Sequence, residues 1–281
     1  MLRTQRALRL LGPADLPEVT QLLSRDPVVN VVADYRARTT QLQPRWLGGE
    51  MSGFYEDGRL VSVCHSAANL MPALATPQAC DAFAERARRQ GRACSTLLGP
   101  EEAVDRMWER LERDWGPARV MRPHQPHLEI DRGPLVRPDP LVRRGAMADL
   151  DVLYPACVAM YTEEVGVSPE ERGGGPVYRA RVAQLVSRGW SFLRVEDGRV
   201  VFKAEIAAAT PHACQVQGVY VAPDRRGEGL ATAGMAAVVD LALREVAPVV
   251  SLYVNAHNIA AQRVYERVGF RRTATFTTIM F

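Results

Sequence analysis

The chain contains two pairs of short segments in which apolar residues either alternate with polar residues or follow one another. In each pair, a tetrapeptide of the same sequence joins the two segments. Glu56-Asp-Gly-Arg59 separates residues 53–55 from 60–64, and Glu196-Asp-Gly-Arg199 separates residues 192–195 from 200–206. Asp-Gly favours a tight hairpin because both residues tolerate a positive φ angle. The pattern therefore predicts one β-hairpin in each half of the chain.

Apolar residues at helical spacing predict further elements around these hairpins. Apolar runs at 217–223 and 249–254 predict two strands that flank a helix. Residues 131–144 contain three prolines and little apolar periodicity, which is typical of a linker. The predicted helices cover residues 78–89, 101–114, 149–162, 177–187, 230–245 and 258–268.

Three short matches recur in the same order in the two halves, and such ordered repetition indicates a duplicated unit. Besides the hairpin tetrapeptides, Ala14-Asp-Leu16 returns as Ala148-Asp-Leu150, and Arg106-Met-Trp-Glu-Arg110 returns as Arg263-Val-Tyr-Glu-Arg267. The matched positions lie 134, 140 and 157 residues apart. The second half therefore holds additional residues between its hairpin and its last helix.

These additional residues include Arg226-Gly-Glu-Gly-Leu-Ala231, directly before a predicted helix. Glycine leaves main-chain amides uncovered, and a helix N-terminus adds the positive end of its dipole, so the segment can hold a pyrophosphate. A glycine pair before a helix is equally typical of a plain turn, and the nucleotide P-loop and dinucleotide patterns are absent. In the first half, Ala75-Thr-Pro-Gln78 enters the corresponding helix without glycine.

Asn258, Ala261 and Tyr265 lie three and then four residues apart, which places them on one face of the last predicted helix. A buried tyrosine on a helix is more often structural than catalytic, and Trp108 takes its place in the first half. Combined with the glycine loop, however, the tyrosine favours a ligand-binding face. The two motifs together could hold a phosphate chain and protonate a thiol.

Composition narrows the class of protein. A hydrophobic content of 47% and a charged content of 24% are typical of globular proteins. The net charge of +3 is too small to indicate a nucleic-acid partner, and the apolar runs are too short to span a membrane. The first residues lack the apolar segment of a secretory signal, and the five cysteines lack metal-site or disulfide spacing. We expect a cytoplasmic protein without a metal, nucleic-acid or membrane partner.

The motifs resemble the core of the GCN5-related N-acetyltransferase (GNAT) superfamily over residues 142–281. The whole chain is also similar to an actinobacterial group of tandem acetyltransferases whose N-terminal domain has no known role. The acetyl-CoA loop of the family is matched by Arg226, Gly229 and Ala231, and its second signature by Asn258, Ala261, Tyr265 and Gly269-Phe270.

The resemblance implies an α/β fold with two tandem GNAT-like domains, each a mixed, mostly antiparallel twisted sheet flanked by helices. Residues 1–132 would be a degenerate copy without the acetyl-CoA loop, 133–143 a linker, and 144–281 the acetyltransferase domain. The first copy could shape the substrate site, mediate homodimerisation or only stabilise the chain.

The resemblance also implies transfer of acetyl from acetyl-CoA to a primary amine of a small molecule, peptide or protein by direct attack. The strands at 217–221 and 249–254 would splay, so that the main chain of Val219 and Val221 pairs with pantetheine. The Val219 amide would polarise the thioester carbonyl, and Tyr265 would protonate the departing thiolate. The implied cofactor-binding residues are Val219, Tyr220, Val221, Arg226, Gly227, Glu228, Gly229, Leu230, Ala231, Asn255, Asn258, Ala261 and Tyr265.

The residues that would bind and deprotonate the amine acceptor have weaker sequence signals. Glu205 is the candidate general base, and it shares a sheet face with Lys203, the only lysine among 35 basic residues. An ion pair that merely lines the sheet fits these two residues equally well. Glu163 and Glu164 could attract a cationic substrate or simply be solvated. The alternatives to N-acetyl transfer are a non-catalytic acetyl-CoA sensor or interaction module, and an acyltransferase that uses a longer acyl or an aminoacyl donor.

Overall fold

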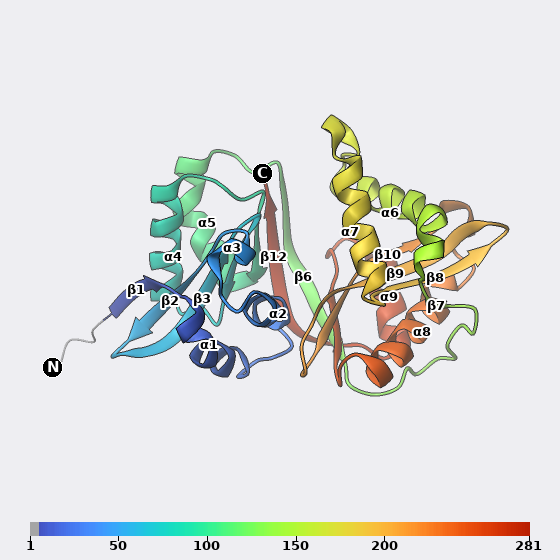
Figure 1. The fold of residues 1–281 in the computed structure, drawn as a ribbon, viewed down its shortest axis with the longest axis horizontal. Helices are drawn as coiled ribbons and strands as arrows, with labels where there is room; N and C mark the ends of the chain where they lie inside the picture. Colours follow the sequence, from blue (N-terminus) through green and yellow to red (C-terminus); the bar gives the residue numbers. More distant parts are fainter. Residues whose placement is uncertain (1–5) are drawn as a thin grey trace. The chain divides into compact units, whose positions relative to one another are not determined.

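A computed structural model describes residues 6–281, which fall into two units (Figure 1). Unit 1 comprises the described residues up to His127 together with Tyr253–Asn258 and Arg272–Phe281, and unit 2 comprises Leu128–Leu252 and Ile259–Arg271. The predicted domains are continuous in sequence, whereas these units are not. Residues 1–5, on which the expectation about a secretory signal partly depends, lie outside the described residues.

Unit 1 contains a sheet with strand order β1-β2-β3-β4-β5-β12-β6. Neighbouring strands from β1 to β4 run antiparallel, β4 and β5 run parallel, and β12 is antiparallel to β5. The strands are β1 (Arg6–Leu10), β2 (Glu50–Glu56), β3 (Arg59–Ser66), β4 (Asn69–Ala73), β5 (Thr96–Pro100), β6 (Val120–Ile130) and β12 (Arg271–Met280). The last three residues of β6 and the first residue of β12 are assigned to unit 2. The helices are α1 (Leu16–Leu23), α2 (Val31–Thr40), α3 (Pro44–Leu47), α4 (Pro77–Gln90) and α5 (Glu101–Trp115).

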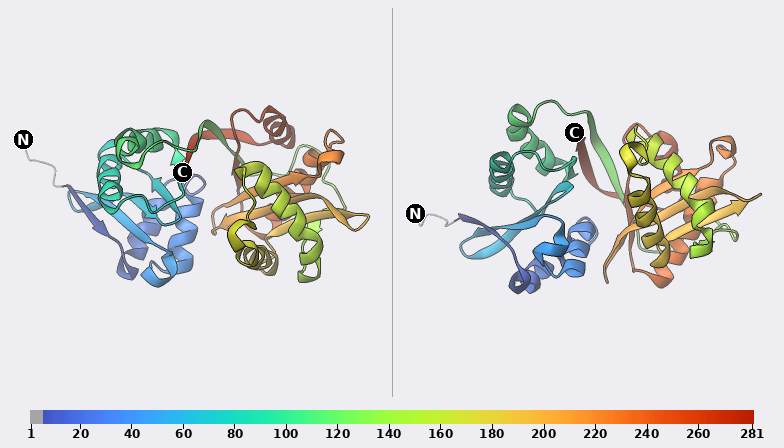
Figure 2. Two further views of the ribbon diagram at one scale, coloured as in Figure 1. Left: turned by 90° about the horizontal axis from the view of Figure 1, so that it is seen from above. Right: turned by 45° about the horizontal axis from the view of Figure 1, so that its top comes forward.

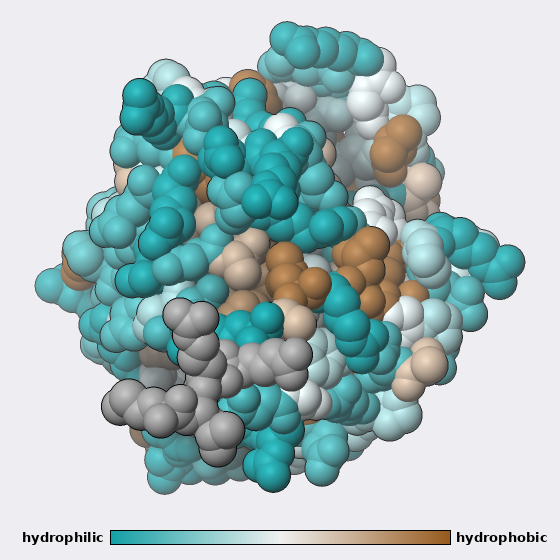
Figure 3. Space-filling model, turned by 90° about the vertical axis from the view of Figure 1, so that its left-hand side faces the viewer, coloured by the Kyte–Doolittle hydropathy of each residue, from teal (hydrophilic) through white to brown (hydrophobic). Residues whose placement is uncertain are grey.

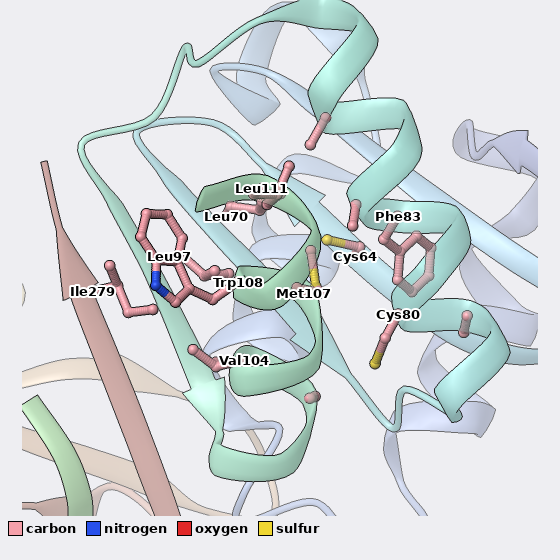
Figure 4. Packing of buried hydrophobic residues seen from close by; sticks show 14 of the residues in the cluster. Cys64, Leu70, Cys80, Phe83, Leu97, Val104, Met107, Trp108, Leu111 and Ile279 are labelled. Atoms are coloured by element: carbon pink, nitrogen blue, oxygen red, sulfur yellow. The ribbon is translucent and has the colours of Figure 1, made fainter. Parts of the chain in front are cut away.

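Helices cover both faces of the unit 1 sheet. The core beneath α4 and α5 includes Trp108, which points into the packed cluster with Leu97 and Ile279 (Figure 4). A second core lies beneath α1, α2 and α3. Neighbouring strand residues alternate between the two cores, as a period of two requires: Phe54 belongs to the first and Tyr55 to the second.

Unit 2 contains the strand order β11-β10-β9-β8-β7, with α6 and α7 packed together on one side of the sheet (Figure 2). Helix α8 packs on β9 and β10 so closely that a Cβ atom on Gly234 would lie 2.7 Å from the Phe202 ring. The strands are β7 (Arg143–Arg144), β8 (Ser191–Glu196), β9 (Arg199–Ala209), β10 (Cys214–Val221) and β11 (Val250–Tyr253). The helices are α6 (Leu150–Val165), α7 (Gly175–Ser187), α8 (Leu230–Glu245) and α9 (Ile259–Val268).

The duplication inferred from the sequence is also visible in matching ion pairs near the start of each unit. In unit 1, both terminal nitrogens of Arg9 donate to the Asp15 carboxylate, at 3.1 and 2.8 Å. In unit 2, Arg143 contacts Asp149 in the same way, at 2.7 Å for both hydrogen bonds. Each aspartate lies in one of the Ala-Asp-Leu matches, so the repeat extends from the sequence to individual contacts.

The structure confirms both predicted hairpins. Asp57 and Gly58 have φ angles of 48° and 79°, and Asp197 and Gly198 have φ angles of 49° and 74°. The six predicted helices correspond to α4 to α9 with small shifts at their ends. A strand follows the last helix of each half, β6 after α5 and β12 after α9, and the sequence patterns do not predict it.

Strand β12 completes unit 1 although it follows the whole of unit 2 in the sequence. It pairs with β5 in the register Phe276↔Pro100 to Met280↔Thr96. The ring of Phe281 lies 5.6 Å from the ring of Trp108, measured between centroids. The first unit is therefore completed by residues from the far end of the sequence.

The side of unit 1 on which β1 lies is mainly hydrophilic, with apolar atoms gathered in one small area near its centre (Figure 3). No helix in residues 6–281 combines the length and apolar character that a membrane crossing requires.

Candidate functional site

Strands β10 and β11 of unit 2 are parallel but pair over a short distance. Within the described residues, the register joins Cys214 to Val250 and Gln215 to Ser251, whereas β10 continues to Val221. The edge of residues 216–221 that faces away from β9 therefore lacks a strand partner in this part of the chain. Such an edge can pair with an extended ligand through main-chain hydrogen bonds.

The strands of unit 1 that correspond to β10 and β11 are β4 and β5, and they too are parallel. A Cβ atom on Gly99 of β5 would lie 3.3 Å from the carbonyl oxygen of Pro72 of β4. The two residues continue the register that begins at Asn69↔Thr96. The main chain of Pro72 therefore lies close to Gly99 beyond the last residue pair, although within the described residues the register of β4 and β5, like that of β10 and β11, joins two pairs.

A β-bulge interrupts β10 at Gly218. Gln217 pairs with Glu205 and Tyr220 pairs with Lys203, so β10 contains one more residue than β9 over this interval. Gly218 has a φ angle of +61°, and a Cβ atom there would lie 3.1 Å from both Glu205 Cδ and Lys203 Nζ. Bulges often occur next to active sites because they redirect main-chain and side-chain groups. This one leaves Gly218 and Val219 outside the β9 register.

A buried polar cluster packs against the bulge. Lys203 Nζ donates to Glu205 Oε2 at 3.0 Å, and Gln217 Nε2 donates to Glu205 Oε1 at 2.9 Å. This confirms the prediction that Lys203 and Glu205 share a sheet face. Burial alone would lower the pKa of Lys203, but the charge of Glu205 and the contact with Cys157 raise it further than burial lowers it. Lys203 therefore remains a charged ammonium group.

The glycine loop ends in an open row of main-chain amides. Gly227 and Gly229 have φ angles of +86° and +83°, and no atom lies within 4 Å of the position of a Cβ on either residue. Gly229 is the N-cap of α8 and provides no side-chain cap. In the described residues, the amides of 227–231 have no hydrogen-bond acceptor. Unpaired amides at a helix N-terminus attract anions.

The corresponding helix start in unit 1 is closed by its own residues. Thr76 caps α4, and its Oγ1 accepts the Ala79 amide at 3.2 Å. Its carbonyl oxygen accepts the Cys80 amide at 2.9 Å. Pro77 has no amide hydrogen to offer. Unit 1 therefore lacks an open row of amides at this position, as the absence of glycine from the segment predicts.

Tyr265 lies on α9 and is 7% exposed. Its ring packs edge-on against Phe270, with 5.8 Å between ring centroids. Burial raises the pKa of Tyr265 above its ordinary value of 10, and the negative charge of Glu164 raises it further. The phenol therefore stays protonated near neutral pH and can act as a proton donor.

Glu163, a candidate for attracting a cationic substrate, contacts the glycine loop. Arg226 Nη2 donates to Glu163 Oε2 at 2.7 Å, and Arg226 Nε donates to the carbonyl oxygen of Val221 at 3.2 Å. These contacts connect the C-terminal end of α6, the loop and the end of β10. Sequence spacing gave no signal for this pair, because the two residues are 63 positions apart.

The predicted cofactor residues are divided between the two units. Ala261 and Tyr265 belong to unit 2, whereas Asn255 and Asn258 belong to the Tyr253–Asn258 segment of unit 1. Within unit 1, Gln125 Nε2 donates to Asn255 Oδ1 at 2.8 Å. Gln125 could not be identified from the sequence, since nothing in its local pattern distinguishes it from other polar residues of a strand.

His127 is a buried titratable residue of unit 1. Burial lowers its pKa to about 4, so the imidazole is neutral at physiological pH. Its Nδ1 lies 3.3 Å from Thr273 Oγ1, and its ring stacks on Phe276. Within residues 6–281, no cluster of three or more His, Cys, Asp or Glu side chains is arranged to hold a metal ion.

Several solved structures have a fold similar to that of this chain. An acetyltransferase of the GNAT family from Colwellia psychrerythraea has 14% sequence identity and a TM-score of 0.55, covering 98% of this chain and 99% of its own. A GCN5-related N-acetyltransferase from Sphaerobacter thermophilus has 17% identity and a TM-score of 0.60, covering 99% and 96%. A tandem GNAT protein from the clavulanic acid biosynthesis pathway has 14% identity and a TM-score of 0.59, covering 98% of both chains. The fold is thus that of tandem GNAT proteins.

Two family models match different parts of the sequence. Residues 158–270 match the acetyltransferase (GNAT) family, and residues 49–153 match a domain of unknown function, DUF4081. The chain therefore contains a GNAT acetyltransferase domain that is preceded by a DUF4081 domain. No curated protein matches the sequence.

Proposed function

We propose that unit 2 binds acetyl-CoA and transfers its acetyl group to a primary amine, and that unit 1 binds no coenzyme. The open row of amides at residues 227–231 is the observation that carries this proposal. The same position in unit 1 is occupied by the Thr76 cap and by Pro77. Of the two corresponding helix starts, that of α8 has an open row of amides, whereas that of α4 does not.

In the proposed complex, pantetheine pairs with the free edge of β10 through the main chain of Val219 and Val221. The amides of 227–231 hold the pyrophosphate, and the Val219 amide at the bulge polarises the thioester carbonyl. The amine nitrogen attacks the carbonyl carbon, and the carbon–sulfur bond breaks. Tyr265 then gives its proton to the departing thiolate.

Glu205 is the proposed general base. Both of its carboxylate oxygens already accept hydrogen bonds, from Lys203 and from Gln217. We therefore propose that Glu205 takes the proton of the attacking ammonium through a water molecule. Glu164, exposed near the end of α6, is the proposed attractor for a cationic acceptor.

A two-part experiment tests the proposed function. Acetyl-CoA is titrated into the full chain by calorimetry, and pooled primary amines are then screened for release of free coenzyme thiol. We expect saturable binding together with amine-dependent thiol release. Binding without release from any amine would favour the sensor alternative, and release only with longer acyl donors would favour the alternative acyltransferase. Absence of binding would refute the cofactor assignment.

Tyr265→Phe tests the proposed proton donor. We expect kcat to fall about 10²-fold, at the low end for acid–base catalysis, because a coenzyme thiolate is already a good leaving group. The KM for acetyl-CoA should change little. Because burial holds the pKa of Tyr265 above 10, the wild-type kcat should show no loss from phenol ionisation between pH 7 and pH 10.

Tyr154→Phe is the matched control, since Tyr154 lies on α6 and donates to Glu170 at 3.1 Å. This variant should retain the wild-type kcat. Full activity of Tyr265→Phe would remove Tyr265 from the mechanism.

A further inference from the structure

A continuous chain of ion pairs within unit 2 ends in the glycine loop. Arg225 Nη1 donates to Glu196 Oε2 at 2.5 Å, and Arg225 Nε donates to Glu228 Oε2 at 2.8 Å. The other carboxylate oxygen of Glu196 pairs with Arg194. Arg194 Nη1 in turn donates to Asp139 Oδ2 at 2.7 Å. The chain therefore runs from Glu228, between the two loop glycines, to residue 139 in the proline-rich segment.

The end of this series of ion pairs at Asp139 is fixed to α8, the helix that follows the glycine loop. Asp139 is 6% exposed, and its amide donates to the carbonyl oxygen of Ala233, in the first turn of α8, at 3.0 Å. Its second carboxylate oxygen accepts the Leu141 amide at 2.9 Å. The ion-pair chain thus contacts the loop at Arg225 and Glu228 and contacts α8 at Ala233. Arg225 precedes the open amides of 227–231, Glu228 lies among them, and Ala233 follows them.

Burial at one end distinguishes this series of ion pairs from an ordinary surface ion pair. The Asp139 side chain is 4% exposed and that of Arg194 is 19% exposed. Nearby, Arg199 pairs with Asp224 at the start of the same loop, but these side chains are 52% and 57% exposed. Water and salt screen exposed pairs strongly and partly buried pairs much less. Toward the loop the side chains are more exposed, at 24% for Glu196, 25% for Arg225 and 46% for Glu228. The ion pairs are therefore buried at Asp139 and partly buried at Arg225, and water screens them less than the Arg199–Asp224 pair.

We propose that Asp139, Arg194 and Glu196 are positioning residues that hold the amides of 227–231 in the geometry required for a pyrophosphate. The inference rests on the proposed binding of acetyl-CoA by unit 2. It gives the segment 133–143, which the sequence suggests is only a linker, a part in coenzyme recognition. None of the three side chains needs to touch the coenzyme, because each acts through Arg225 and the loop.

The test compares two ligands that differ in the group recognised by the loop. Glu196→Gln removes the charge that Arg194 and Arg225 share, and Asp139→Asn weakens the chain at its other end. We expect coenzyme A affinity, measured by calorimetry, to fall about tenfold in Glu196→Gln, as for other partners that orient a binding group. Asp139→Asn should act in the same direction. The affinity for pantetheine, which lacks the pyrophosphate, should stay at the wild-type value in competition experiments.

Asp224→Asn is the control, because it breaks the exposed ion pair beside the same loop and should leave both affinities unchanged. Circular dichroism melting of each variant shows whether the fold is retained. Unchanged coenzyme A affinity in both Glu196→Gln and Asp139→Asn would overturn the inference, as would an equal loss for both ligands. If the wild-type chain binds no coenzyme A, the proposed function itself fails, and that result is distinct from either outcome in the variants.

Discussion

Deletion of residues 272–281 is expected to unfold unit 1, although these residues follow all of unit 2 in the sequence. The deletion removes β12, in which Phe276 and Ile279 are 4% and 0% exposed. It also removes Phe281 from its contacts with Trp108 and Trp115. Each buried large apolar side chain contributes about 1.5–3 kcal/mol, whereas the whole stability of a domain is about 5–15 kcal/mol.

Hydrogen exchange followed by mass spectrometry measures this effect by segment. Amides of β2 to β5 should lose protection in the deletion variant. Ile279→Val is the matched control, because removing a single buried methylene typically costs only about 0.5–1.5 kcal/mol. Wild-type protection of β2 to β5 after the deletion would show that β12 is dispensable for unit 1.

Gly218→Val is expected to disable the proposed site. A β-branched residue is strongly disfavoured at a φ angle of +61°, and its Cβ would stand 3.1 Å from Glu205 Cδ and Lys203 Nζ. Either the bulge straightens or the ion pair moves away, and both changes displace the Val219 amide. Losing an aligned oxyanion donor typically lowers kcat about 10²- to 10³-fold.

Gly198→Val separates this effect from backbone strain alone. Gly198 also has a positive φ angle, of +74°, but no atom lies within 4 Å of the position of its Cβ. Both variants should lose stability, which thermal melting measures, but only Gly218→Val should lose kcat with an accepted amine. Equal kcat values for the two variants would contradict a role for the bulge in the reaction.

Local patterns in the sequence were sufficient for much of the fold. Asp-Gly set both hairpins because its conformational preference does not depend on distant residues. The apolar period of 3.6 residues gave α4 to α9 for the same reason. The period of two places residues 203 and 205 on one sheet face, and their ion pair is one of the two interpretations that this placement leaves open.

Features that depend on distant partners could not be predicted. The alternation of a strand identifies its buried face but not its neighbouring strand, so nothing local indicated that β12 pairs with β5. Asp139 was assigned to a linker because prolines surround it. Its burial depends on Arg194, 55 residues later in the chain. The bulge at Gly218 could not be predicted either, because a bulge is defined by the register with β9.

The position of β12 also affects the order in which the protein can fold during synthesis. Residues 272–281 leave the ribosome only after the chain of unit 2 has been made, so the edge of β5 has no β12 partner throughout that time. An unpaired strand edge invites pairing with other chains, and long waiting times increase that risk. We therefore expect the nascent N-terminal half to depend on chaperones, and conditions that slow translation of residues 128–271 to promote its aggregation.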